Sequence, residues 1–153
     1  MFCAKHLLPL CRCHSAVLLF QSTTRLSINL SCFQPLTTLL HHQLCPCSLT
    51  ICSWGSYKDG KLGIETDRDH LVPTEIPFFR DKKVVRIAAG CDHSAVVTSH
   101  GNVYTWGFGQ HGALGHGDLL DSPTPRQVPR FQGAASIADV QCGMDVTLVQ
   151  TIL

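Results

Sequence analysis

The sequence predicts an all-β protein containing part of a β-propeller, with about two four-stranded antiparallel blades. The first observation is a repeat: from about residue 50 the chain repeats itself with a period close to 52 residues. The second is the content of each repeat, which consists of short apolar stretches separated by glycine and proline without a convincing helical pattern. A β-strand repeat of about 50 residues is typical of a propeller blade.

The repeat is defined by matching tryptophan, glycine and leucine positions. It divides residues 49–153 into units of about 50–101 and 102–153. The second unit has one inserted residue after Phe131, so the offset between matching positions changes from 52 to 53. At an offset of 52 the matches are Trp54 with Trp106, Gly55 with Gly107, Gly60 with Gly112, Leu62 with Leu114 and Gly63 with Gly115; at an offset of 53 they are Gly90 with Gly143 and Ser94 with Thr147.

One unit shows the expected strands in order. Residues 83–90 form a short apolar stretch that ends at glycine, and residues 93–99 follow as a second strand. His100-Gly101 is a hairpin turn signal, and residues 102–107 form a third strand. In this strand Val103 and Thr105 face one side, whereas Tyr104 and Trp106 face the other. After a glycine-rich loop, the prolines of residues 123–131 favour an edge strand or an irregular connection.

Residues 1–48 differ in composition from the rest of the chain. They carry three basic residues and no acidic ones, giving +3, whereas residues 49–153 carry nine basic and eleven acidic residues, giving −2. They lack glycine, hold six of the nine cysteines and show no sustained period. We therefore expect a segment of low order. A mitochondrial transit peptide and a secretory signal remain alternatives, beside a segment with no selected fold.

Metal, nucleic-acid and membrane functions have little support in the sequence. Cys11, Cys13, His14, His41, His42, Cys45 and Cys47 offer zinc ligands, but the paired cysteines are closer than in zinc fingers, and His111 and His116 lack carboxylate or thiol companions. The net charge of +1 argues against a nucleic-acid surface. No apolar run is long enough to span a bilayer. We expect no cofactor, no direct nucleic-acid contact and no membrane contact.

The repeat resembles the regulator of chromosome condensation repeat family. The resemblance rests on Ala88-Ala89-Gly90-Cys91-Asp92-His93-Ser94-Ala95-Val96-Val97 and on a Trp-Gly pair followed by Gly-x-Leu-Gly, present from Trp54 to Gly63 and from Trp106 to Gly115. It implies blades of a seven-bladed propeller and a noncatalytic protein-interaction module. The alternative it implies is guanine-nucleotide exchange on a Ran-type small GTPase, the activity of the family's founder.

The chain departs from the family pattern near its ends. Val146 stands where the family has histidine, Gln141 and Cys142 replace the small pair, and Leu49 stands where Gly101 would align. Only two units are present, so we expect a fragment or truncated isoform of a longer propeller protein. Open sheet edges also predict self-association.

The polar residues of the signature are expected to be structural. Asp92, His93 and Ser94 are adjacent in sequence, but a catalytic triad needs them adjacent in space. We expect His93 to be a hydrogen-bonded residue that ties one blade to the next, and Trp54 and Trp106 to pack inside blades. The scattered cysteines of residues 49–153 favour a reducing compartment, the cytosol or the nucleus, with mitochondria as a minority alternative.

Overall fold

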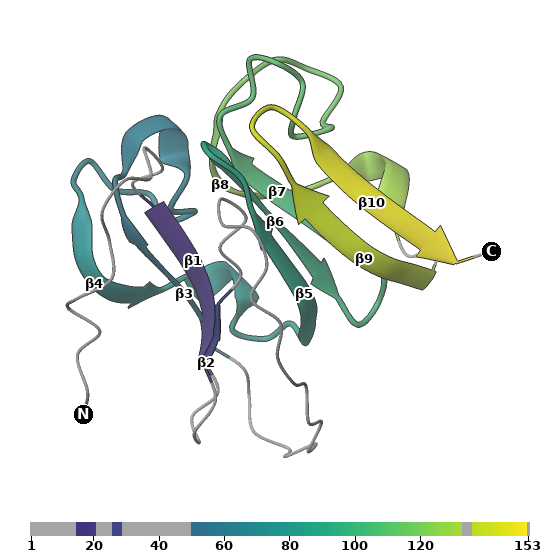
Figure 1. Ribbon diagram of the computed structural model, residues 1–153, viewed down its shortest axis with the longest axis horizontal. Helices are drawn as coiled ribbons and strands as arrows, with labels where there is room; N and C mark the ends of the chain where they lie inside the picture. Colours follow the sequence, from purple (N-terminus) through teal and green to yellow (C-terminus); the bar gives the residue numbers. More distant parts are fainter. Residues whose placement is uncertain (1–14, 21–25, 29–49, 133–135, 153) are drawn as a thin grey trace.

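The computed structural model describes residues 15–20, 26–28, 50–132 and 136–152, and shows three antiparallel sheets side by side in chain order (Figure 1). The first sheet has the order β2-β1-β3-β4, the central sheet β5-β6-β7-β8, and the third sheet consists of β9 and β10. The all-β prediction is confirmed, and the first and central sheets each have four strands. In the described part of the chain, no helix is long and apolar enough to cross a membrane.

The central sheet contains the strands expected from the sequence. They are β5 (Val84–Ala89), β6 (His93–Thr98), β7 (Val103–Gly107) and β8 (Ser122–Gln127). Gly101, at φ 73°, donates its N–H to the carbonyl of Thr98 in the β6–β7 turn, a conformation that favours glycine. The proline-containing β8 lies at the sheet edge, where a missing backbone donor is tolerated.

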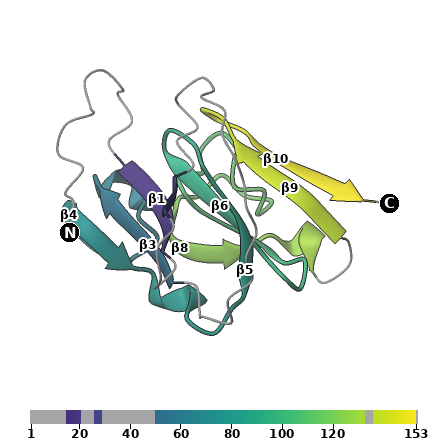
Figure 2. The same ribbon diagram turned by 60° about the horizontal axis from the view of Figure 1, so that its bottom comes forward.

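The two outer sheets differ in strand number. The first contains β1 (Ser15–Phe20), β2 (Leu26–Ile28), β3 (Thr50–Gly55) and β4 (His70–Glu75). Among the residues that the structure describes, the third contains only β9 (Ser136–Cys142) and β10 (Thr147–Ile152). Within residues 50–132, three short 3₁₀ helices lie in the connections: η1 (Lys58–Gly60), η2 (Pro77–Phe79) and η3 (Pro129–Phe131). Figure 2 shows the third sheet at one side of the central sheet and β3 and β4 at the other.

Each sequence repeat contributes to two sheets. The unit at about 50–101 supplies β3 and β4 to the first sheet and β5 and β6 to the central one. Its boundary falls in the β6–β7 turn, where hydrogen-bonded pairing joins the end of one unit to the start of the next. The repeat boundary near residue 101 therefore lies in the middle of the central sheet, and the four strands expected between residues 83 and 131 form that one sheet. Each repeat consequently links two sheets covalently.

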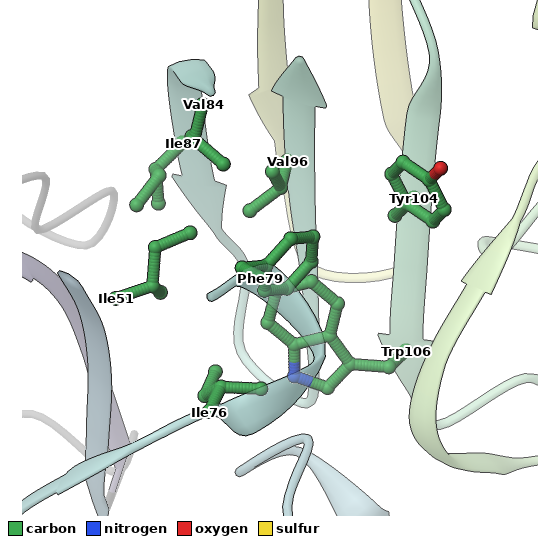
Figure 3. Close-up of a cluster of buried hydrophobic side chains, with 8 residues drawn as sticks. All are labelled: Ile51, Ile76, Phe79, Val84, Ile87, Val96, Tyr104 and Trp106. Atoms are coloured by element: carbon green, nitrogen blue, oxygen red, sulfur yellow. The ribbon is translucent and has the colours of Figure 1, made fainter. Parts of the chain in front are cut away.

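Two apolar clusters fill the spaces on either side of the central sheet. The cluster between the first and central sheets is drawn in Figure 3 and consists of Ile51, Ile76, Phe79, Val84, Ile87, Val96, Tyr104 and Trp106. The other includes Ala88, Ala95, Val97, Val103, Val140 and Cys142. Tyr104 and Trp106 thus face the first sheet and Val103 faces the third, as the alternation along β7 predicts.

The segment preceding residue 49 supplies two strands to the first sheet. β1 pairs with β3 over six residues, from Ser15 opposite Gly55 to Phe20 opposite Thr50, and β2 pairs with β1. Apart from Ser15–Phe20 and Leu26–Ile28, the segment expected to be of low order lies outside the described residues, together with its cysteine and histidine groups at positions 3–14 and 32–47. β1 occupies, beside β3, the place that β6 occupies beside β7.

Candidate functional site: the joints between sheets and an adjoining groove

The tryptophan of the second repeat closes the joint between the first and central sheets. Trp106, on β7, is fully buried, and its indole Nε1 donates a hydrogen bond of 3.1 Å to the carbonyl oxygen of Lys61. A β-carbon on Gly63 would lie only 2.6 Å from that nitrogen, and Gly63 has φ 68°. Glycine is therefore needed here both for backbone conformation and for space. The Gly-x-Leu-Gly loop of the first repeat, with Leu62 fully buried, receives the tryptophan of the second.

Two further contacts strengthen the same joint. A β-carbon on Gly60 would lie 2.4 Å from the Cα of Pro123, so β8 packs directly on this loop. The ammonium group of Lys61, whose side chain is 8% exposed, forms an ion pair with the carboxylate of Asp92. The loop after β3 thus contacts the central sheet through packing and through charge.

His93 lies at the joint between the central and third sheets. Its Nε2 is 2.9 Å from Oγ1 of Thr147, which belongs to β10. Burial lowers the pKa of His93, opposed by the Val146 carbonyl and nearby carboxylates, so the imidazole is neutral at physiological pH. A β-carbon on Gly90 would lie 2.4 Å from the carbonyl oxygen of Gly143. The histidine is thus placed to tie two blades together.

The equivalent loop of the second repeat lacks the close contacts that the first loop makes with a neighbouring sheet. Gly112 and Gly115 have φ 76° and 70°, close to Gly60 and Gly63. A β-carbon on Gly112 would meet only Leu119 at 3.7 Å, however, and one on Gly115 only Val128 at 3.4 Å. Neither approach is as close as those at the first loop, so the second loop has a vacant position among the described residues.

The other signature residues have structural surroundings. Gly55 and Gly107 end β3 and β7 with φ 110° and 106°, and Ser94 is buried on β6. Leu114 is buried, and Gly143 donates its N–H to the carbonyl of Val146 in the β9–β10 turn. Trp54 is partly buried on β3, in contrast to Trp106.

The adjacent Asp92, His93 and Ser94 do not form a catalytic relay. The carboxylate of Asp92 pairs with Lys61, while His93 Nε2 pairs with Thr147. The expectation that the loop histidines lack carboxylate companions is wrong for His111, which pairs with Asp145 at 3.0 Å; His116 Nε2 lies 3.2 Å from Oγ1 of Thr105. Among the described residues, no group of three or more histidine, cysteine, aspartate or glutamate side chains could hold a metal ion.

An open groove of about 1080 Å³ lies beside the first joint. One wall is the segment from Gly63 to His70, and the other includes Phe78 of η2 with Thr124 and Pro125 of β8. Phe78 is 39% exposed, and Lys82 Nζ lies 4.0 Å from the centroid of its ring. The groove therefore offers apolar surface at the boundary between two sheets.

Polar groups line the same groove. His70 lies between two hydroxyls, with Nε2 3.0 Å from Thr66 Oγ1 and Nδ1 2.9 Å from Thr74 Oγ1. The Arg80 guanidinium donates to both carboxylate oxygens of Glu75, at 3.1 and 2.9 Å, and lowers the pKa of that carboxyl. Three carboxylates but one arginine line the groove, namely Glu65, Asp67, Glu75 and Arg68. The groove thus combines exposed apolar and acidic surface.

These sheets and joints define a repeat protein of the β-propeller class. The sequence model of the regulator of chromosome condensation (RCC1) repeat matches residues 50–97 and 100–150, and a second model of the same repeat matches residues 84–113. The chain belongs to the RCC1 repeat family.

Relatives with curated descriptions match about three fifths of the chain. The ultraviolet-B receptor UVR8 of Arabidopsis thaliana is 38% identical over 96 residues, which are 63% of this chain and 22% of the receptor. The human E3 ubiquitin-protein ligase HERC2 is 43% identical over 93 residues, which are 61% of this chain and 2% of the ligase. The match therefore covers a small share of each relative.

Solved structures agree with the fold. Prp20p from Saccharomyces cerevisiae, described with its binding properties to Gsp1p and histones, superimposes with a TM-score of 0.61 at 26% identity, covering 67% of this chain and 27% of that protein. Human WBSCR16 gives a TM-score of 0.57 at 28% identity, covering 70% and 29%.

The groove and the strand β1 were not predicted from the sequence. The groove joins residues from two sheets, and no local motif marks it. β1 did carry a signal: His14-Ser15-Ala16-Val17 repeats His93-Ser94-Ala95-Val96 of the family signature. The surrounding cysteine-rich and glycine-free sequence hid this four-residue match.

Proposed function

We propose that the chain is a noncatalytic protein-interaction module that binds an extended segment of a partner protein in the groove beside Phe78. The observation that carries this proposal is the open groove of about 1080 Å³ at the boundary between two sheets. Membership of the RCC1 repeat family, whose relatives are a receptor, ligases and a protein that binds Gsp1p and histones, supports a role in protein binding.

The lining of the groove indicates the chemistry of the partner segment. Exposed carboxylates at Glu65 and Asp67 attract basic side chains, and the Phe78 ring with Pro125 provides an apolar surface for a neighbouring side chain. We therefore expect an extended segment in which lysine or arginine alternates with apolar residues.

The noncatalytic character is supported by the use of the signature residues. Lys61 with Asp92, His93 with Thr147, and Trp106 with the Lys61 carbonyl all form contacts between sheets. Their polar atoms are therefore occupied in structural contacts.

The groove is tested by fluorescence polarisation with two labelled peptides of equal length. In one, lysine and arginine alternate with proline and leucine; in the other, glutamate replaces the basic residues. We expect the basic peptide to bind, Asp67→Lys to weaken it, and Asp81→Lys to leave it unchanged, because Asp81 is an exposed acid outside the groove. Equal binding of the two peptides, or equal effects of the two variants, would reject the groove as the binding site.

The second candidate is guanine-nucleotide exchange on a Ran-type small GTPase. It is supported by the structural similarity to Prp20p, whose description includes binding to Gsp1p. The measurement is release of labelled GDP from the GTPase with the chain in stoichiometric excess. Faster release would favour exchange over a binding role, and an unchanged rate would remove this candidate.

We also propose a reducing compartment, the cytosol or the nucleus, with mitochondria as the minority alternative. The buried thiols of Cys52 and Cys142, which form no disulfide, support this proposal. Imaging of a tagged full chain tests it, and secretion or accumulation in mitochondria would contradict the main proposal.

A further inference from the structure

The third sheet has an edge that resembles an interior position of the central sheet. In the described part of the chain, β10 pairs only with β9, whereas its counterpart β6 lies between β5 and β7. All residues of β6 are buried, but Leu148 and Ile152 of β10 are 62% and 61% exposed. β10 therefore presents an apolar strand with backbone groups available for pairing.

The loop next to this edge has a vacant position for an indole. In the first repeat, the loop from Gly60 to Gly63 is filled by Trp106 and Pro123. In the second repeat, Gly112 and Gly115 have φ 76° and 70°, close to the 72° and 68° of Gly60 and Gly63, and the loop has no such filling among the described residues. Ala113, 52 positions after Lys61, stands where the carbonyl that accepts the indole N–H would be.

The central sheet shows which strand fits beside β10. There, Ser94 pairs with Trp106 and His93 with Gly107. The equivalent of Ser94 on β10 is Thr147, so the fitting strand places a Trp-Gly pair opposite Thr147 and Val146. The chain has a second strand of this kind, β3, which ends in Trp54-Gly55.

Within one chain, the edge of β3 is already occupied. β1 pairs with β3 so that Ser15 lies opposite Gly55 and Ala16 opposite Trp54. β1 thus lies where β6 lies beside β7, displaced by one residue. Relative to the four-residue match of His14-Ser15-Ala16-Val17 with His93-Ser94-Ala95-Val96, the pairing of β1 with β3 is therefore one residue out of register.

We propose that copies of this chain join head to tail. In the joint, β3 of one copy separates from its own β1 and pairs instead with β10 of the next copy. The joined strands β9, β10, β3 and β4 would form a four-stranded sheet like the central one, and Trp54 would enter the loop at Gly112–Gly115. The contact joins two different strands, β10 of one copy and β3 of another, which makes it heterologous. β1 acts as an intramolecular competitor that limits this assembly. The inference does not depend on the proposed groove.

The test is sedimentation velocity of the full chain from low to high micromolar concentration. We expect the mean mass to rise with concentration, and the double variant Leu148→Lys with Ile152→Lys to weaken association by about tenfold or more, because it places two charges in the joined sheet. Both side chains are exposed, so the single chain keeps its fold. The matched control is Val85→Lys, another exposed strand residue, on β5.

A second pair of variants tests the competition by β1. Val17 pairs with Ser53 on β3, so Val17→Pro disrupts this pairing, whereas Val17→Ala keeps the backbone donor. We expect the proline variant to associate more strongly than the alanine variant. Adding Leu148→Lys and Ile152→Lys to the proline variant should abolish this increase in association. The proposal is overturned if neither wild type nor Val17→Pro associates, or if Val85→Lys weakens association as much as the β10 variant. It is also overturned if wild type and the β10 variant associate equally.

Discussion

A β-carbon on Gly63 would lie 2.6 Å from the indole nitrogen of Trp106, 43 positions further along the chain and on the neighbouring sheet. The glycine and the tryptophan belong to different repeats. The Trp-Gly pair and the Gly-x-Leu-Gly loop therefore act together across the joint between sheets.

Replacing Gly63 by alanine is expected to lower the free energy of unfolding by about 3 kcal/mol or more. The positive φ contributes about 1–2 kcal/mol, and displacement of the indole adds the rest. Gly115→Ala is the matched control, because Gly115 has φ 70° against 68° but its β-carbon would meet only Val128 at 3.4 Å. Urea unfolding followed by tryptophan fluorescence measures both. Equal losses would show that the close contact with Trp106 contributes nothing.

His93 makes the stability dependent on pH. Burial lowers its pKa in the folded chain, so unfolding takes up a proton once the pH falls toward the unfolded value of about 6.5. Stability is full above that pH and declines below it, by at most about 1.4 kcal/mol per pH unit for one proton. We expect His93→Gln to flatten this decline.

The comparison for His93 is the exposed His100, replaced by glutamine in the same way. Urea midpoints between pH 7.5 and about pH 5 give the slopes. Some slope should remain in His93→Gln, because burial also lowers the pKa of His116. If His93→Gln keeps the wild-type slope and His100→Gln loses it, the buried imidazole is not the titrating group.

Much of the fold, and little of the candidate groove, could be predicted from the sequence. Glycine at 101 and the alternation along Val103–Gly107 are local signals, and local chemistry decides turns and strand faces. The groove depends on Phe78 and Pro125 lying near each other at the boundary between two sheets. They are far apart in sequence, and no local pattern indicates that they share a groove. β1 was not predicted for two reasons: its four-residue match to the family signature lies in cysteine-rich, glycine-free sequence, and its pairing partner, β3, begins 30 residues after β1 ends.

The ion pair between Lys61 and Asp92 is expected to respond unequally to removal of each partner. Asp92→Asn leaves a nearly buried ammonium group without its counter-charge, which we expect to cost about 1–2 kcal/mol after allowance for solvent around the half-exposed Asp92. Lys61→Met keeps an apolar stem of similar length and should cost less. Chemical unfolding of both variants gives the comparison.

The reference for this pair is the exposed ion pair between Arg126 and Asp118. Arg126→Gln should change stability less than Asp92→Asn, because exposed pairs contribute little. A larger loss of unfolding free energy for Lys61→Met than for Asp92→Asn would contradict this expectation. It would indicate that the contacts of the Lys61 ammonium group matter more than the cost of leaving its charge unpaired.

Cys142 is expected to resist alkylation in the folded chain. Burial raises the pKa of its thiol to about 12, with a smaller opposing effect of the Thr147 hydroxyl, whose oxygen lies 3.9 Å from Sγ. Only the thiolate reacts, so a rise from the ordinary 9.0 predicts about a thousandfold slower labelling than in urea, before steric protection is counted. A pulse of iodoacetamide followed by peptide mass spectrometry measures both rates. Thr147→Val removes the hydroxyl that also bonds His93, so this variant should loosen the third sheet and speed labelling in the folded chain. Labelling of native Cys142 as fast as in urea would mean that the third sheet opens freely from the central one.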